Sequence, residues 1–409
     1  FAIHRDRANH LSWSWTGGFY GNVDIGVAGK ASAWQPGWCG ALALAFALMK
    51  GGGELEWERG RSSLDFLFSM QHATGLFPQD ADADGKAVNM LGSGREHWAM
   101  LRQTCDALKL AFKCFSLFDD RGQEIPNAWL AGASKAADAL VHIWEKNGQW
   151  GQFYDLEKDK IAVGGSTNAA AGISVLVAAY RRFRQGRYLE VAKAAGELFY
   201  IRDAARGYTC GGPGDALQSP DSESCYALLG GLLDLYDATL ESTWLARARH
   251  VANLFSSWVV PYNYRFPPKS EFGKLNMHTV GTVFANTANK HSAPGICTES
   301  GAALYRLYQY TQDARYLQLF KEIALTIGQY VSTDVRPIYS WDMPKDAVAR
   351  GLEDVRVEPE RLVQGTICER VNMSDWEGPR CIGGVFNGNC WCQAAHLLTL
   401  VDAMPLLEP

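Results

Sequence analysis

Two short segments carry carboxylates at positions where they could do chemistry. The segment "SPDSES" (219–224) places Asp221 and Glu223 directly before an apolar run, and "GICTES" (295–300) places Glu299 before another. A general acid and a general base on either side of a bond could cleave it by adding water. The same residues could instead cap helices, because Asp, Ser and Glu at a helix start satisfy free backbone N–H groups and complement the helix dipole.

The spacing of these carboxylates indicates which of them could act as a pair. Asp221 and Glu223 are two residues apart, so they do not face each other on a helix. Glu299 belongs to the next apolar segment, and the axes of packed helices lie about 8 to 10 Å apart. Glu299 with one of the other two carboxylates therefore suits the separation of about 6.5 to 9.5 Å that an inverting hydrolase needs. We expect Glu299, inside an apolar helix, to be the acid, and Asp221 or Glu223 to be the base.

Asp106 is a further candidate for the catalytic pair. It lies in "RQTCDALKL" (102–110), four residues after Arg102, inside an apolar helical pattern. An ion pair between Arg102 and Asp106 within one helix would explain it without chemistry. A carboxylate in such a helix could also act directly on a substrate, so Asp106 stays a second-rank catalytic candidate.

The elements that must position these residues are helical hairpins, which recur along the chain. Five times a loop rich in Gly, Ser, Asn or Pro opens a strongly apolar helix, a short polar turn follows, and a more amphipathic helix returns. We expect these first helices to begin near Trp38, Trp98, Ser166, Asp221 and Pro294, with a sixth near Asn389. The return helices share an aromatic-Leu pair at Trp129-Leu130, Tyr188-Leu189, Trp244-Leu245 and Tyr316-Leu317.

This arrangement predicts an all-α fold. First helices that are apolar nearly all round are buried on both sides, and their irregular spacing suits a closed ring better than an open solenoid. The sixth first helix has no partner after it, so N-terminal or connecting segments must close the ring. With phrases such as "LDFLFSMQHATGLFPQD" and "WEKNGQWGQFYD", the chain resembles the six-hairpin, or (α/α)6 toroid, glycosidase superfamily. The resemblance implies a toroid of helical hairpins with irregular insertions at the active-site end.

We expect residues 1–409 to form a single catalytic domain. Residues 1–35 read as short strands or loops. Residues 335–385 break the hairpin rhythm and are polar, so we interpret them as an irregular insertion beside the ring.

In a closed ring the loops that open the inner helices meet at one end. We expect this end to form a basin of aromatic and hydrogen-bonding side chains, which is what a sugar ring requires from its site. Besides the carboxylates, the expected substrate-binding residues are Trp34, Trp38, Arg95, His97, Asn168, His291, Asn387 and Trp391, with Glu96 in the same loops.

The sequence therefore favours a glycoside hydrolase that acts on an oligosaccharide or polysaccharide fragment by general acid and base catalysis, with inversion. A polysaccharide lyase or sugar epimerase on the same fold is the alternative, and His97 with Arg95, His291 or His396 could serve it. A second alternative is a helical-repeat binding protein without chemistry. In some six-hairpin unsaturated-uronyl hydrolases, which the chain resembles in architecture, aspartates of inner helices are catalytic, and this would suit Asp106.

Composition argues against nucleic acid and membranes as partners. The net charge of -5 and the pI near 6.0 provide no basic surface for nucleic acid, and the longest apolar runs are too short to span a membrane. We expect a carbohydrate substrate, and the oligomeric state stays open. The chain starts at Phe1 without a signal peptide, which fits a cytoplasmic protein or a periplasmic or secreted one whose signal peptide is not in this sequence.

We expect no cofactor and no metal. The acidic loop "PQDADADG" (78–85) lacks the terminal Glu of a calcium loop. The C-terminal cysteines (Cys368, Cys381, Cys390 and Cys392) have no second close pair, so they are a weak metal signal. Cys105 and Cys114 lie in apolar helical patterns, where we expect buried free thiols.

Overall fold

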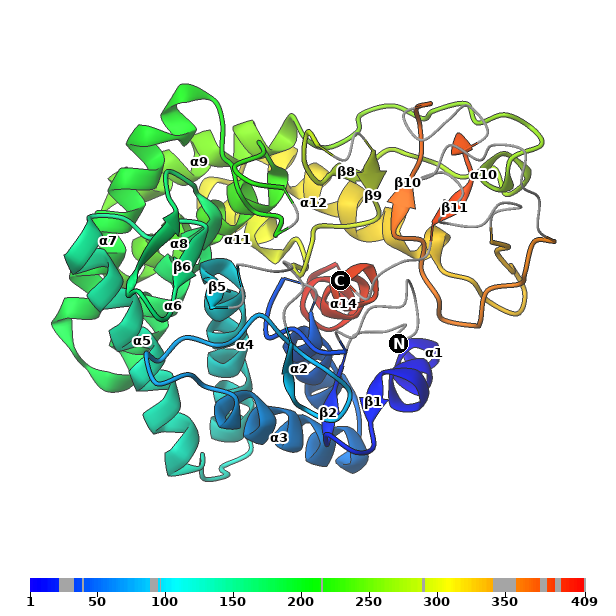
Figure 1. Ribbon diagram of the computed structural model, residues 1–409. Coiled ribbons are helices and arrows are strands. Elements are labelled where there is room, and N and C mark those ends of the chain that lie inside the picture. Colours follow the sequence, from blue (N-terminus) through cyan, green and yellow to red (C-terminus); the bar gives the residue numbers. More distant parts are fainter. Residues whose placement is uncertain are drawn as a thin grey trace.

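The computed structural model shows a closed ring of helices (Figure 1). It describes residues 1–21, 33–38, 40–88, 95, 97–214, 216–288, 291–340, 358–375, 381–386 and 391–407. Within these residues the inner layer consists of α2 (Ala41–Gly51), α4 (Leu101–Asp120), α6 (Ala171–Phe183), α8 (Ser222–Thr239), α11 (Ala302–Thr311) and α14 (Trp391–Leu398). From α2 to α11 each inner helix contacts the next, and α11 contacts η7 (Thr399–Ala403), the π-helical continuation of α14. Both α14 and η7 contact α2, which closes the ring. The predicted all-α (α/α)6 toroid is confirmed.

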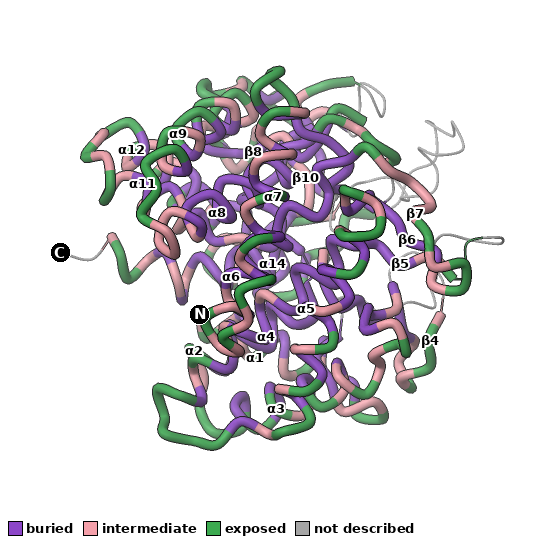
Figure 2. The backbone as a smooth tube through the Cα atoms, turned by 90° about the vertical axis from the view of Figure 1, so that its left-hand side faces the viewer, coloured by how far each residue is buried: buried purple, intermediate pink, exposed green. Residues whose placement is uncertain are grey.

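The outer layer wraps this ring. It consists of α3 (Glu54–Ser69), α5 (Asn127–Asn147), α7 (Gly186–Arg202), α9 (Ser242–Ser256) and α12 (Ala314–Thr326). Figure 2 shows buried residues concentrated on the inner helices and exposed ones on the outside of the outer helices. Four of these outer helices, α5, α7, α9 and α12, carry the expected aromatic-Leu pair near their start, and the aromatic residue of each pair is buried.

The two layers differ in their apolar patterns for a physical reason. In α2 every residue from Ala41 to Met49 is buried, because this helix has protein on all sides. In α12 the buried residues recur three to four positions apart, at Tyr316, Phe320 and Ile323, while Gln318 and Lys321 between them are exposed. Burial of one apolar stripe is enough to dock an outer helix onto the ring.

Two inner helices begin later than the sequence predicts. Residues Trp98–Met100 form strand β5 instead of the first turn of α4, since their backbone pairs with β6 (Phe153–Asp155). Residues 294–300 form a loop instead of the first turns of α11, because Gly301 adopts φ 83° and the helix starts only after it. Glu299 therefore lies in a loop, not one turn inside a helix.

The N-terminal segment closes the ring. Residues expected to be strands or loops instead form helix α1 (Ala2–Arg7) and a π-helical turn η1 (Ala8–Ser12). His4 and His396 of α14 share a hydrogen bond of 2.8 Å between their ring nitrogens, and burial lowers the pKa of both. Figure 1 shows blue α1 beside red α14. Of the two possibilities that the sequence left open, N-terminal or connecting segments, the N-terminal segment binds the sixth inner helix.

Short strands build most of the connections that lead into the inner helices. Strands β5, β6 and β7 (Lys160–Val163) form an antiparallel sheet ahead of α4 and α6, and the pair β3 (Asp80–Ala81) and β4 (Ala87–Val88) also precedes α4. The pair β1 (Trp13–Ser14) and β2 (Phe19–Tyr20) follows η1. The largest sheet has the order β11 (Val385–Phe386), β10 (Arg370–Val371), β9 (Ser292–Ala293), β8 (Val283–Phe284).

Residues expected as an insertion contribute to that largest sheet. Their described parts supply β10 and β11, and they bury Ile338, Ile367 and Val371 in a second hydrophobic cluster beside the ring. The described parts of this segment therefore pack onto the protein through a cluster that they share with other segments, although much of the segment is polar. In the described part of the chain, no helix has the length and apolarity to cross a membrane.

Arg7 allows a test of how the ring closes. Its buried guanidinium donates to Gln393 Oε1 at 3.0 Å and to Thr366 Oγ1 at 3.1 Å. Arg7→Met should lower the free energy of unfolding by about 2 to 4 kcal/mol, because the buried acceptors lose a charged donor. Arg5→Met, at a half-buried position on the same helix, should change it by less than about 1 kcal/mol. Urea denaturation measures both, and equal effects would contradict a closing role for α1.

Candidate active site

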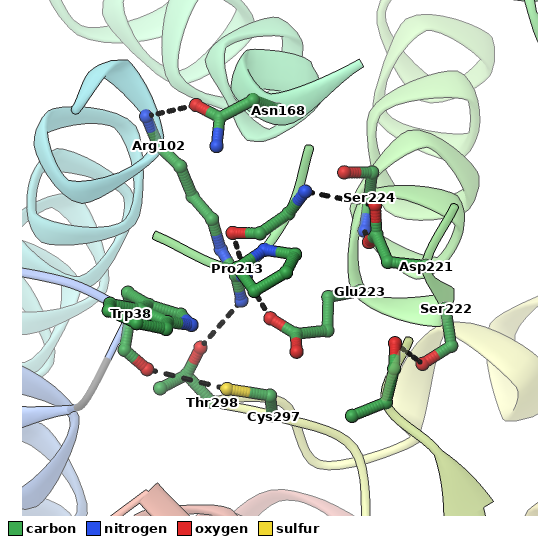
Figure 3. A network of polar contacts seen from close by, with 12 residues as sticks. Trp38, Arg102, Asn168, Pro213, Asp221, Ser222, Glu223, Ser224, Cys297 and Thr298 are labelled. Carbon is green, nitrogen blue, oxygen red and sulfur yellow. Dashed lines mark hydrogen bonds and ion pairs between the residues drawn. The ribbon is translucent and has the colours of Figure 1, made fainter. Parts of the chain in front are cut away.

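Arg102 is the centre of a buried polar cluster at the end of the ring where the inner helices begin. Its Nε donates to Asp106 Oδ2 at 3.1 Å, and its Nη1 binds a carboxylate oxygen of Glu223. Nη1 also donates to the Gly212 carbonyl at 2.8 Å, and Nη2 donates to Thr298 Oγ1 at 3.4 Å. Figure 3 shows the side chain reaching from α4 into the space between these groups. One guanidinium thus joins α4, α8 and two loops.

Asp221 caps α8. Its carboxylate accepts the backbone N–H of Ser224 at 2.5 Å with one oxygen and that of Gly212 at 2.9 Å with the other. The side chain is fully buried, and burial, followed by the nearby charge of Glu223, raises its pKa to about 7. Asp221 therefore fixes the 211–214 loop against the start of α8. This capping role explains the buried carboxyl without a catalytic function.

Asp106 lies beside the start of α2. Besides Arg102 it accepts the backbone N–H of Trp38 at 3.2 Å. Burial raises the pKa of this carboxyl, Arg102 opposes that shift, and the charge of Glu299 adds to it. Asp106 and Glu223 bind different nitrogens of one guanidinium, so the structure brings these two candidate carboxylates together.

Glu299 binds α4 at a different level. Its Oε1 accepts a hydrogen bond from Lys109 Nζ at 2.5 Å. Lys109 is seven residues beyond Arg102, which is about 10 Å along a helix. Glu299 and Glu223 are therefore bound to the same helix two turns apart, while Asp106 lies between those levels.

Trp38 is the aromatic residue next to the cluster. It is half-buried, and its φ of 62° is unusual for a bulky side chain. Its ring packs so closely on Gly214 that an added Cβ there would lie 2.8 Å from it. The Cys297 thiol donates to its carbonyl at 3.4 Å. Strained backbone of this kind is often found at functional sites.

The other two tryptophans expected in the basin are buried in the protein. Trp34 is only 2% exposed and packs edge-on against Phe19 and Phe66. Trp391 belongs to the second hydrophobic cluster, at the start of α14. Packing accounts for both residues without a ligand.

The remaining candidates divide between the cluster and its surroundings. Asn168 is buried and accepts the Arg102 backbone N–H at 2.9 Å, so it positions the start of α4. His97 is half exposed and pairs with Glu157 at 3.1 Å, while Arg95 stacks over the Trp98 ring. Asn387 and Glu96 lie outside the described residues.

His291 lies next to β9. Its Nδ1 faces the Ser292 carbonyl at 3.1 Å, and its Nε2 is buried without a hydrogen-bond partner. Burial and the charge of Arg370 lower its pKa to about 3. The ring is therefore neutral at ordinary pH.

The structure also identifies polar residues that the sequence analysis missed. Lys109 and Lys113 on α4 point toward carboxylates of other segments, Glu299 and Asp402. Together with Arg102 and Asp106 they stand at spacings of four, three and four residues. Charged residues at helical spacing on an inner, otherwise apolar helix were the signal that could have revealed this stripe.

Within the described residues, no group of three or more His, Cys, Asp or Glu side chains is arranged to hold a metal ion. The Asp82 carboxylate of the acidic loop accepts the backbone N–H groups of Asp84 and Lys86, so it closes a turn. Cys105 and Cys114 are buried and free, as expected.

No protein-family model matches the chain, and no curated protein matches its sequence. Solved structures do match its fold. A cellobiose 2-epimerase from Bacillus thermoamylovorans has a TM-score of 0.57 at 12% identity, covering 97% of this chain and 95% of that one. An unsaturated glucuronyl hydrolase specific for heparin has a TM-score of 0.57 at 12% identity, covering 99% and 95%.

A family 76 glycoside hydrolase, a mannosidase from Bacteroides thetaiotaomicron, has a TM-score of 0.58 at 11% identity. The match covers 100% of this chain and 98% of that one. Similarity at such low identity establishes the fold and leaves the reaction open. The chain therefore has the (α/α)6 toroid fold, as the sequence predicts.

Asp221 predicts a pH dependence of stability. Its folded-state pKa of about 7 exceeds the ordinary 3.8, so between these values the folded protein holds a proton that the unfolded chain has released. The contribution of Asp221 to the free energy of unfolding is therefore full below pH 3.8 and falls toward pH 7, by up to about 1.4 kcal/mol per pH unit. Asp221→Asn should remove this fall, as measured by urea denaturation between pH 4 and 7.

Asp313, which caps α12, is the matched control. Hydrogen bonds from Arg315 lower its pKa to about 2, so its contribution is present above pH 3.8 and disappears only in acid. Asp313→Asn should therefore leave the slope between pH 4 and 7 unchanged. An unchanged slope in Asp221→Asn as well would show that the carboxyl is ionised throughout.

Proposed function

We propose that this protein is a carbohydrate-active enzyme that hydrolyses a glycosidic bond, with Asp106 as general acid and Glu223 as general base. The observation that carries the proposal is the Arg102 guanidinium, which holds both carboxylates at the helix-start end of the ring. The three proteins with this fold named above are an epimerase, a glucuronyl hydrolase and a mannosidase, so their names all refer to sugars.

The two carboxylates are suited to different roles. Burial raises the pKa of Asp106, which favours the protonated form that an acid needs. Glu223 at the first turn of α8 has the helix dipole and Arg102 to stabilise its charge, which suits a base. The two carboxyl groups bind different nitrogens of the guanidinium, so they do not share a proton. An inverting mechanism requires a water molecule between the two carboxyl groups, and this arrangement allows one.

In this reaction Asp106 donates its proton to the glycosidic oxygen while that bond breaks. Glu223 takes a proton from the water that attacks the anomeric carbon, so the products contain one added water. Trp38 offers a half-buried ring beside the cluster, on which the apolar face of a sugar can stack. Glu299, expected from the sequence as the acid, is replaced in this proposal because it binds Lys109 at a lower level.

A sugar epimerase or polysaccharide lyase is the second candidate, and His291 is the observation that favours it. Its buried Nε2 has no hydrogen-bond partner, and the ring is neutral at ordinary pH, so one ring nitrogen carries a lone pair that can accept a proton. Such a base could remove a proton from a sugar carbon. His97, which the sequence suggested for this role, is half exposed and paired with Glu157.

Labelled oligosaccharides incubated in ¹⁸O-water, with mass detection of products, test the proposal. Hydrolysis places ¹⁸O in one product, whereas elimination and epimerisation add no water. Asp106→Asn and Glu223→Gln should each lower kcat by about 10² to 10⁴, because an acid or base contributes that factor. Asp65→Asn on outer helix α3, where Asp65 accepts the Trp129 indole N–H, is a control that should keep the rate.

Three outcomes would contradict the assignment. Loss of turnover in Glu299→Gln with full activity in Asp106→Asn would make Glu299 the acid. Products without ¹⁸O, together with inactivity of His291→Gln, would favour the epimerase or lyase. If sugars bind but none is converted to a product, the protein is a binding protein rather than an enzyme.

A further inference from the structure

A cavity lies farther along α4 than the Arg102 cluster. Its volume is about 420 Å³, within the usual range for small-molecule sites. It is lined by the second half of α4, by α6, by α8 and by the start of α11. Glu299 and Lys109 line this cavity, and their ion pair lies between the cavity and the Arg102 cluster.

Two buried polar atoms of residues that line this cavity have no hydrogen-bond partner. They are the Ser174 hydroxyl of α6 and the Nε–H of Arg306 on α11. A buried donor without a partner costs about 1 to 3 kcal/mol, and Ser174 as a residue is over nine-tenths buried. Oxygen atoms of a bound molecule would satisfy both groups.

Charge on the cavity wall indicates what else the ligand carries. Lys109, Lys113 and Arg306 are bound to Glu299, Asp402 and Asp234, respectively. Arg181 at the end of α6 also lines the cavity, is exposed, and makes no hydrogen bond or ion pair with any residue in the described ranges. A guanidinium is well suited to bind a carboxylate through two parallel hydrogen bonds.

Gly230 shows that the space inside this cavity is open. It lies in the middle of α8, yet an added Cβ would meet no atom within 4 Å, whereas one on the adjacent Gly231 would lie 2.8 Å from Ile173. Glycine in a helix interior costs about 1 kcal/mol relative to alanine. Gly231 is explained by close packing, and Gly230 by the cavity it borders.

From these groups we infer that the cavity binds a hydroxylated carboxylic acid of about the size of one sugar ring. Arg181 takes the carboxylate, Ser174 and Arg306 Nε bind oxygens, and the apolar wall at Phe112 and Val177 contacts the carbon skeleton. This site is separate from the proposed hydrolytic site and needs no chemistry there.

Isothermal titration calorimetry with D-glucuronate as probe tests the inference, with D-glucose and inorganic phosphate for comparison. Glucuronate should bind at least about tenfold more tightly than either, because only it combines the carboxylate with hydroxyl groups. Arg181→Ala should weaken glucuronate binding at least about tenfold, and Gly230→Leu, which fills the cavity, should abolish it. Arg182→Ala, the neighbouring arginine that pairs with Asp119, should bind glucuronate as the wild type does.

A thermal melt of each variant shows whether it is folded. If folded Gly230→Leu still binds glucuronate, the probe occupies another site and the inference is wrong. It is also wrong if glucose binds as tightly as glucuronate, or if millimolar glucuronate produces no heat with the wild type. These outcomes are independent of turnover, so failure here differs from failure of the proposed hydrolysis.

Discussion

The arrangement at the helix-start end of the ring depends on one buried cation. Arg102 binds the carboxyl groups of both Asp106 and Glu223, and it also binds the 211–214 loop and the loop before α11. Burying such charges is costly, and the cost is offset only when each ion has partners at good geometry. Without Arg102, two carboxylates would remain in a region that excludes water, and the loops would lose their common anchor. The ion pairs therefore specify where the loops sit more than they add stability.

The loops around this cation hold strained backbone. Trp38 and Thr298 both have positive φ, at 62° and 54°, and the Cys297 thiol, next to Thr298, donates to the Trp38 carbonyl. A non-glycine residue in this region of φ persists only where surrounding contacts impose it. Here the contacts are the Trp38 N–H on Asp106 and the Thr298 hydroxyl on Arg102. The strained backbone is therefore held in place by the same hydrogen bonds that bind the charged cluster.

The ring could be predicted from the sequence, because a helix buried on all sides and a helix buried on one side leave different local patterns. The helix starts were less predictable, since "PGICTES" reads as helical until Gly301 is known to take a positive φ. Residues such as Trp34 and Trp391 were placed in the basin because their loops lead there, but a loop does not determine whether its tryptophan faces solvent or core. Long-range partners decide this, and a single sequence does not contain them.

The same limit explains why the sequence pairs Glu299 with Asp221 or Glu223 without showing that Glu299 binds Lys109, two turns of α4 beyond Arg102. The stripe of α4 at Arg102, Asp106, Lys109 and Lys113 faces the ring axis, and carboxylates from three other segments bind its cations. Along this stripe α4 is therefore bound to the other segments by ion pairs rather than by apolar packing. Charged groups consequently lie both in the Arg102 cluster and on the wall of the cavity. Beyond the effect of burial, which raises it, the pKa of Asp106 depends on both groups, because Arg102 lowers it and the charge of Glu299 raises it. A molecule that disturbed the pairing of Lys109 with Glu299 would thus shift the proton equilibrium of Asp106 without touching the mouth.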